Sequence, residues 1–480
     1  MPAAGATPRS CASTSRHDAP LHLIFVPFLS RSHFAPLAAQ AAAAAAVSPG
    51  GGSGSVTILT TPHFAALAPA SVRVREAPVR FPVEDFSLLP EDDDGAASAP
   101  AFFAAAQAAL APALAEAVRA IIAQDAGAAV AVVSDAVLHW SPGVARECGV
   151  PHVTFHTIGA FAAAAMVASA HLHRPGPGPA AVLLPGGFPA QGQLKLRRAH
   201  VDEQALAHLP IFRAAEAQSH AVVFNTFSAL EADFAEYYRT ADNDGSPTKV
   251  FLVGPRRTGG GVTTGSAAER DPILQWLDGQ EAGSVVYACF GSTCGLSSSQ
   301  LKELAAGLRA SGMPFLWVIP TMPTEDLQEE RASRNGMVVA GRWAPQGEIL
   351  AHGAVGGFVS HCGWNSALDA LCAGVPLATW PLRADQFLNE ALLVDVLRVG
   401  VRVREVACQA DGGAVVPAEA VAGAVGKLMA SDGADEAAGR KARVKELAVA
   451  ARAAVEEGGS SCGDWTRLVD ELKALHGLPR

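Results

Sequence analysis

The chain has 480 residues, of which half are apolar, and a formal net charge of −10 at pH 7. This length predicts two domains of roughly 200–250 residues, each with a sizeable core. The negative charge argues against a nucleic-acid partner. The eight cysteines include no CxxC pair, which argues against structural zinc and favours a reducing, cytoplasmic compartment.

Residues 1–20 are polar and rich in Ala and Ser, without the apolar core of a signal peptide. We expect a disordered leader here. A weak transit peptide is the alternative, because the segment holds Arg9 and Arg16 and only one acid, Asp18. We expect no apolar run that is long enough to span a bilayer. These features predict a cytoplasmic protein with no membrane insertion, and we expect a monomer.

Strands and helices alternate along residues 21–256, which we interpret as the first domain. Apolar runs predict strands at 21–28, 55–61, 72–78, 129–135, 152–157, 221–227 and 249–255. An Ala-rich helix is expected at 101–124 and a shorter one near 142–148. Stretches rich in Ala, Gly and Pro at 49–55 and 175–192 predict loops.

A stretch rich in Gly and Thr, 257–268, begins a linker that we place at 257–283. The second domain, 284–480, repeats the alternation. Its strands are expected at 284–292, 315–320, 337–343, 356–360, 376–380 and 399–406, and helices from 417 to 475 close the chain. This α/β alternation predicts two doubly wound parallel sheets, each with helices on both faces.

Residues 343–386 hold the densest group of chemistry-bearing side chains: WAPQGEILAHGAVGGFVSHCGWNSALDALCAGVPLATWPLRADQ. The strand 356–360 ends at His361, and a helix then opens with Asn365 and Ser366, which suit an N-cap. A helix N-terminus at the end of a strand attracts anions, because unpaired N–H groups and the helix dipole point at the ligand.

The next strand, 376–380, delivers Asp385 and Gln386 to the same edge of the sheet. Ligands of open α/β sheets bind beyond the carboxyl ends of the strands, so these side chains should converge with His361 on one crevice. An indole, an anion site and a polar pair, in this order, suit a flat base, a diphosphate and a hydroxylated ring.

This segment closely resembles the signature of plant family 1 UDP-dependent glycosyltransferases, and it matches that signature without a gap. The resemblance extends more loosely over most of the chain. It implies the GT-B fold, in which two Rossmann-like domains face each other with the donor site in the cleft and the last helix returns to the first domain. It also implies transfer of a sugar without a cofactor or an essential metal, and the sequence shows no DxD-type cluster.

The resemblance also assigns the donor contacts. Trp343 stacks on uracil, with the Ala344 backbone beside it and Gln346 on the ribose side. The diphosphate contacts are His361, Asn365, Ser366 and, from the first strand of this half, Ser292. Trp364, Asp385 and Gln386 hold the sugar hydroxyls, and the terminal Gln resembles members that use UDP-glucose. The alternative interpretation is that the Trp and His residues are ordinary core residues.

Glycosyl transfer to a hydroxyl needs a base, and His suits this role because its unperturbed pKa is close to neutral pH. The family's catalytic His stands three residues ahead of a Pro, which His33 and Pro36 match. Asp135, at the end of the strand 129–135, matches the acid that orients this His. The alternatives are a local hydrogen bond for His33 and a helix N-cap for Asp135.

Three positions depart from the family pattern. Ser32 replaces the usual Gly before the catalytic His, and Asp369 replaces a ribose-binding Glu that is one methylene longer. Arg383 stands where an apolar residue is more common. This cation is an exposed side chain, a partner of Asp385, or a group that favours an acidic sugar such as glucuronate.

The sequence therefore predicts an inverting UDP-glucosyltransferase that acts on a hydroxyl of a small lipophilic acceptor: a flavonoid, another phenol, a terpenoid or a hormone. Two alternatives stay open, namely a sugar-nucleotide epimerase or hydrolase on the same fold and a non-catalytic UDP-sugar-binding protein. Candidate walls of the acceptor site, which are equally candidate core residues, are Phe86, Phe102, Phe103, Phe155, Phe161, His139 and Trp140.

Overall fold

The computed structural model describes residues 20–47, 54–89, 95–125, 127–172, 184–194, 196, 200–201, 203–241, 249–256, 271–291, 296–319, 335–404, 415–430 and 435–476. The predicted leader up to residue 19, the part of the linker at 257–270 and Ser292 lie outside these residues.

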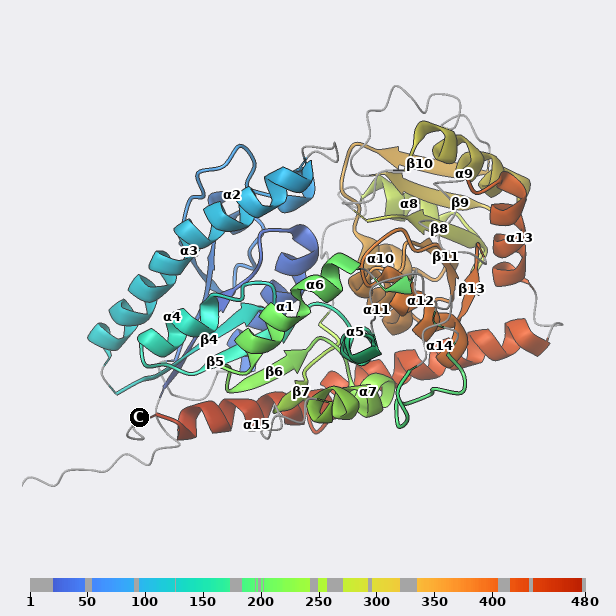
Figure 1. Cartoon of the computed structure of the whole chain (residues 1–480). Coiled ribbons are helices and arrows are strands. Elements are labelled where there is room, and N and C mark those ends of the chain that lie inside the picture. The colour runs from blue at the N-terminus through green and yellow to red at the C-terminus, as the bar shows by residue number, and fades with distance from the viewer. Residues whose placement is uncertain are drawn as a thin grey trace, which may run out of the picture.

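Two parallel sheets, one in each half of the chain, form the frame of the molecule (Figure 1). The first has the strand order β3-β2-β1-β4-β5-β6-β7 and the second β10-β9-β8-β11-β12-β13. The strands of the first sheet are β1 (Leu21–Val26), β2 (Val56–Thr60), β3 (Arg73–Glu76), β4 (Ala129–Asp135), β5 (His152–His156), β6 (Ala221–Phe224) and β7 (Val250–Leu252). Those of the second are β8 (Val285–Cys289), β9 (Phe315–Ile319), β10 (Gly336–Ala340), β11 (Val355–Ser360), β12 (Leu377–Thr379) and β13 (Gly400–Arg402). This architecture confirms the predicted doubly wound α/β class.

Helices connect the strands and cover the sheets. The first half contains α1 (Arg31–Val47), α2 (Pro62–Ala65), η2 (Phe86–Leu88), α3 (Gly95–Gln124), α4 (Ser141–Glu147), α5 (Ala160–Leu172), α6 (Glu203–Glu216) and α7 (Ser228–Thr240). The rest of the chain contains α8 (Pro272–Asp278), α9 (Ser298–Ala310), α10 (Gln346–Ala351), α11 (Trp364–Ala373), α12 (Gln386–Ala391), the π-helical turn η6 (Leu392–Val396), α13 (Ala418–Met429), α14 (Asp435–Val455) and α15 (Ser460–Ala474). Helix α8 lies inside the segment that the sequence predicts to be a linker.

The strand order reverses between β1 and β4 in the first sheet, and between β8 and β11 in the second. At such a switch point the connections leave toward opposite faces of the sheet, and a crevice opens beyond the carboxyl ends of the strands. His33 lies in α1, directly after β1, and Asp135 is the last residue of β4. His361 follows β11. The topology therefore brings the predicted site residues to the two switch points.

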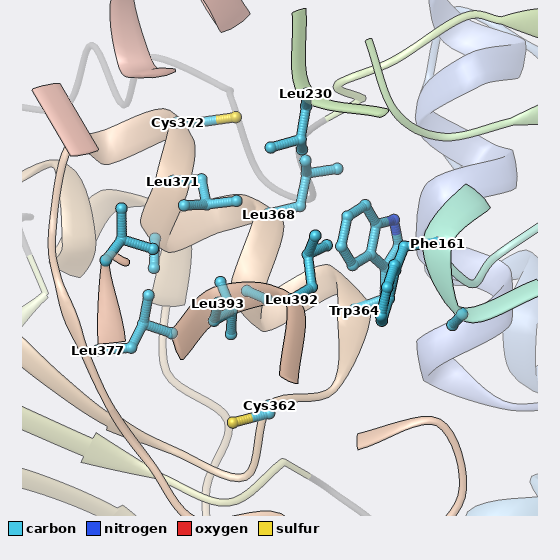
Figure 2. Packing of buried hydrophobic residues seen from close by; sticks show 14 of the residues in the cluster. Phe161, Leu230, Cys362, Trp364, Leu368, Leu371, Cys372, Leu377, Leu392 and Leu393 are labelled. Carbon is cyan, nitrogen blue, oxygen red and sulfur yellow. The ribbon is translucent and has the colours of Figure 1, made fainter. Parts of the chain in front are cut away.

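An apolar core runs from the first half of the chain into the second and includes Phe161 and Trp364. In Figure 2 the Trp364 ring points toward α5, which carries Phe161. The same ring lies so close to Gly159 that a Cβ there would come within 3.1 Å of two of its carbons. The indole N–H donates a hydrogen bond of 3.0 Å to the backbone oxygen of Asn225. Trp364 thus joins the two halves of the molecule.

Helix α15 returns to the first half and lies along β7 (Figure 1). Its apolar side chains Trp465, Leu468 and Leu472 are buried in the core of the first sheet. The Asp464 carboxylate accepts the backbone N–H of Leu252 at 2.8 Å. Glu471 accepts hydrogen bonds from His220 at 3.0 Å and Lys249 at 2.6 Å. The chain therefore connects its halves a second time, away from the cleft.

Helix α3 corrects one expectation. Its segment Ala99–Gln124 is long and apolar enough to cross a bilayer by length and composition, with a mean hydropathy of 1.5 in its most apolar window. The expectation that no run reaches this length was wrong, because a series of alanines counts as apolar although each methyl is small. The side chains of Phe102, Ala106, Leu110 and Leu114 recur every four residues and are buried in the core of the first sheet. This spacing is that of a helix packed against a core along one face.

Candidate functional site

His33 and Asp135 meet at the switch point of the first sheet. The Nδ1 atom of His33 lies 2.8 Å from Oδ2 of Asp135, although 102 residues separate them in the sequence. The other oxygen of Asp135 accepts the backbone N–H of Val137 at 3.1 Å, so the carboxylate is fixed at both atoms. A carboxylate accepts a proton-bearing Nδ1, which leaves Nε2 as the nitrogen that can take up a proton.

The charges around His33 favour its protonated form. Burial lowers the pKa of His33, but the charge of Asp135, its hydrogen bond to Nδ1 and the charge of Asp385 together raise it above its usual value of 6.5. Burial raises the pKa of Asp385, and the charge of His33 acts against this shift. His33 in the first half therefore lies within electrostatic range of Asp385 in the second half.

Thr157 also contacts His33, which the sequence interpretation missed. Its Oγ1 lies 3.1 Å from Nδ1 of His33. Thr157 follows β5, so it reaches the same sheet edge as Asp135 at the end of β4. Its position as the last residue of the predicted strand 152–157 was the signal that could have identified it.

His361 is held in a narrow space after β11. A Cβ at Gly291 or Gly363 would come within 2.9 or 2.5 Å of its Nε2 atom, so a larger residue at either position would displace the ring. Burial and the charge of Arg383 lower the pKa of His361 to about 4, so the ring is neutral at pH 7. Its buried Nδ1 makes no hydrogen bond of normal geometry among the described residues, although a contact of the ring with the Cys289 backbone acts to raise its pKa. A buried polar atom without a partner is costly unless a ligand satisfies it.

The start of α11 differs from the sequence prediction. Gly363 is the N-cap, and Asn365 and Ser366 lie in the first turn of the helix instead. The Asn365 side-chain amide donates to the backbone oxygen of Ser32, in the other half of the molecule, at 2.6 Å. The Ser366 hydroxyl accepts the Gln346 amide at 3.1 Å. The side chains expected to cap the helix therefore make longer-range contacts.

The residues predicted to bind the nucleoside gather around the start of α10. The Gln346 amide, which bonds to Ser366, also donates to the Asp369 carboxylate at 3.2 Å. Ala344 is buried, and its carbonyl accepts the backbone N–H of Gln346 at 2.8 Å. Trp343, by contrast, is 53% exposed. An exposed indole beside a hydrogen-bonded Gln–Asp pair suits a base and its ribose.

The side chains predicted to bind the sugar already make hydrogen bonds within the protein. The Gln386 side-chain carbonyl accepts the backbone N–H groups of Leu382 at 2.9 Å and Arg383 at 3.0 Å. The Asp385 carboxylate accepts the Asn389 amide at 2.8 Å. The indole of Trp364 is committed to the contact with the first half, so a sugar contact from this residue would use its backbone.

Aromatic side chains surround the approach to His33. The Phe28 ring meets the His33 ring edge-on, with centroids 5.3 Å apart, and stacks on Phe103 at 5.0 Å. The candidate acceptor residues Phe102, Phe155 and Phe161 are completely buried and belong to the core. Among the residues that the structure describes, no group of three His, Cys, Asp or Glu side chains is arranged to hold a metal ion.

Comparisons with known proteins agree with this geometry. A family model described as UDP-glucoronosyl and UDP-glucosyl transferase matches residues 265–410. UDP-glycosyltransferase 73C3 of Arabidopsis thaliana is 33% identical over 95% of this chain and 97% of its own length. The scopoletin glucosyltransferase of Nicotiana tabacum is 35% identical over 71% of this chain and 74% of its own length.

A solved structure resembles the whole fold. Phytolacca americana UGT2, in complex with UDP-2fluoro-glucose and pterostilbene, superposes with a TM-score of 0.75 at 28% identity, over 95% of this chain and all of the other. The two facing α/β domains are thus the GT-B fold. Similarity along nearly the full length of such relatives shows that the chain belongs to the plant family 1 UDP-glycosyltransferases.

Proposed function

We propose that this glycosyltransferase is an inverting UDP-glucosyltransferase that transfers glucose to a hydroxyl of a small lipophilic acceptor. The observation that carries the proposal is the His33–Asp135 pair, which faces Asp385 of the donor side within electrostatic range. We expect the enzyme to act as a cytoplasmic monomer without a cofactor or a metal ion.

His33 acts as the general base. The acceptor oxygen forms a bond to the anomeric carbon as its proton passes to Nε2 of His33, and the bond from that carbon to the β-phosphate oxygen breaks. UDP leaves with the electron pair of that bond. Asp135 stabilises the imidazolium through Nδ1. Attack opposite the leaving group inverts the anomeric configuration.

The donor side supports a nucleotide-sugar. The neutral His361 ring offers its unpaired Nδ1, and the first turn of α11 offers unpaired backbone N–H groups, to the diphosphate. Ser292 is assigned to the same diphosphate by the family resemblance. Gln386, at the end of the signature, favours glucose, and the fluorinated UDP-glucose bound to the Phytolacca americana relative supports that choice.

The acceptor side supports a flat, apolar molecule. Phe28, Phe86 and Phe103 form a connected group of rings, and the edge of Phe28 meets His33. One relative is named a scopoletin glucosyltransferase, and the structure of another contains bound pterostilbene. We therefore expect a phenol or a similar aromatic alcohol to be glucosylated.

The test is a transfer assay with UDP-glucose, UDP-galactose and UDP-glucuronate, each with a mixed library of flavonoids, phenols and terpenoids, read by mass spectrometry. We expect a product heavier by one hexose from UDP-glucose. His33→Ala should lower the rate by about 10²- to 10⁴-fold while UDP binding persists. His476→Ala, two residues after the end of α15, is the matched control. Release of UDP without an acceptor would favour a hydrolase, and UDP binding without turnover would favour a binding protein.

Arg383 supports UDP-glucuronate as a second donor. Its charge lowers the pKa of His361, so the guanidinium lies within electrostatic range of a residue that we assign to the diphosphate. A cation in this position suits an anionic sugar. Preference for UDP-glucuronate in the same assay, lost in Arg383→Ala, would support this alternative and contradict glucose as the donor sugar.

A further inference from the structure

The two residues ahead of His33 both contact the donor side of the cleft. The guanidinium carbon of Arg31 lies 5.2 Å from the centroid of the Trp343 ring. The backbone oxygen of Ser32 accepts the Asn365 side-chain amide at 2.6 Å. Arg31, Ser32 and His33 are the first three residues of α1. The turn that carries the base is therefore attached to the opposite domain at two adjacent points.

The first half of the molecule orients Arg31 as well. Its Nε lies 3.8 Å from Oδ2 of Asp85, whose side chain is almost completely buried. The other oxygen of Asp85 accepts the backbone N–H and the hydroxyl of Ser87, at 2.9 and 2.5 Å. The guanidinium of Arg31 therefore lies close both to a fixed carboxylate of the first half and to the indole of Trp343. A cation over an indole is attracted by the negative face of the ring.

The two donor-side partners each have a second group that is open to a ligand. Trp343 is 53% exposed, although Arg31 lies over its ring. The Oδ1 atom of Asn365 is buried and has no hydrogen-bond partner among the described residues. Each of these residues therefore contacts the first turn of α1 with one group and keeps another for the nucleotide.

We infer that Arg31 is a positioning residue that couples occupancy of the nucleotide site to the placement of His33. Uracil takes the face of Trp343 opposite to Arg31, and Asn365 contacts the donor while it holds Ser32. A bound UDP-sugar fixes Trp343 and Asn365, and these residues fix the turn that presents the base. The inference rests on the proposed function, because it requires a UDP-sugar at Trp343.

Ser32 fits this role without strain, although the family usually has Gly at this position. Residue 32 lies inside α1 and is not among the described non-glycine residues with a positive φ. Its hydroxyl lies 3.1 Å from the hydroxyl of Ser30, on the first-half side of the turn. The contact with Asn365 uses only the backbone oxygen, so the replacement of Gly by Ser leaves the coupling intact.

A double-mutant cycle with Arg31→Ala and Trp343→Ala tests the inference. Arg31→Ala should weaken UDP binding and lower kcat/KM for the UDP-sugar. In the Trp343→Ala background, the loss of UDP affinity caused by Arg31→Ala should be smaller by about 2- to 5-fold, which is the size of one exposed cation–π contact. Arg31→Lys keeps a cation and should recover part of the loss. Arg452→Ala, an exposed arginine on α14, is the control and should change neither quantity. UDP affinity is measured by calorimetry, and thermal unfolding checks that each variant is folded.

Two results would overturn the inference. Additive effects of the two substitutions would show that Arg31 does not act through Trp343. Tighter UDP binding by Arg31→Ala would show that the guanidinium occupies the place that uracil takes on the Trp343 ring. Either result with an active wild type leaves the proposed function standing, whereas a wild type that neither binds UDP nor transfers sugar removes both.

Discussion

The two sides of the cleft are prepared to different degrees. On the first-half side, His33 already has its acid partner Asp135 and a second contact from Thr157. On the donor side, Nδ1 of His361 and Oδ1 of Asn365 are buried without partners among the described residues. We therefore propose that the base His33 is preorganised, whereas a bound ligand completes the donor side. Preorganisation removes the cost of arranging the base during the reaction.

Breaking the preorganised side should have the largest effect. Asp135→Asn leaves the shape of the site but removes the charge that stabilises the imidazolium, and the Asn amide favours the wrong tautomer of His33. We expect a fall in kcat on the order of 10³- to 10⁴-fold, as for other histidines that lose their orienting acid. UDP affinity should stay within about twofold, because the donor side is untouched. Steady-state kinetics and calorimetry measure the two quantities.

The pH profile of the same variant sharpens the comparison. Only neutral His33 can act as a base, so kcat/KM of the wild type should rise with pH through the raised pKa of His33, above 6.5. Removal of the Asp135 charge lowers this pKa, so the residual activity of Asp135→Asn should rise at lower pH. Asp233→Asn, an exposed acid on α7, is the control. An unshifted profile in Asp135→Asn would contradict the assignment of His33 as the titrating group.

The next largest effect is expected at Trp364, whose contact with Asn225 joins the two halves of the molecule. Trp364→Ala removes a ring that is 3% exposed and leaves the Asn225 carbonyl without its donor. We expect a loss of about 3–5 kcal/mol in the free energy of unfolding. Trp364→Phe keeps most of the ring and should cost less, because its main effect is to leave the buried Asn225 carbonyl without a donor, which costs about 1–3 kcal/mol.

Urea unfolding of the full chain measures these losses. Trp343→Ala is the matched control, since this exposed indole should contribute less than about 1 kcal/mol. Equal losses for the two tryptophans would show that Trp364 is not part of a core shared by the two halves.

Substitutions on the donor side should change UDP affinity and leave the free energy of unfolding nearly unchanged. His361→Ala removes the unpaired Nδ1 that we assign to the diphosphate, so UDP affinity should fall by roughly 10- to 100-fold, the range of a hydrogen bond to a charged group. Because the pKa of His361 is lowered to about 4, its ring stays neutral between about pH 6 and 8, and the loss should be constant across this range. His352→Ala is the control. Unchanged UDP affinity in His361→Ala would remove this residue from the donor site.

The difference between the two sides also decides what the sequence could predict. Strand positions, the two sheets and the ends of β4 and β11 follow from apolar periodicity and were predicted. The prediction that Asn365 caps α11 was wrong, because its side chain bonds instead to the Ser32 backbone, 333 residues away in the sequence. The contacts of Trp364 with Asn225 and of Arg31 with Trp343 were missed for the same reason. No local pattern encodes a partner in the other domain.

The smallest expected effect concerns Asp369, the shortened acid of the donor side. Its carboxylate already bonds to the Gln346 amide at 3.2 Å, so the two side chains present one hydrogen-bonded surface to the ribose. We expect Asp369→Glu to lower the KM for the UDP-sugar by less than about threefold, because the pair compensates for most of the missing methylene. Gln346→Ala removes that compensation, so adding Asp369→Glu to it should restore more affinity than adding it to the wild type. A tenfold lower KM in Asp369→Glu alone would show instead that the short acid is an uncompensated defect, and that the donor side is less complete than its hydrogen bonds indicate.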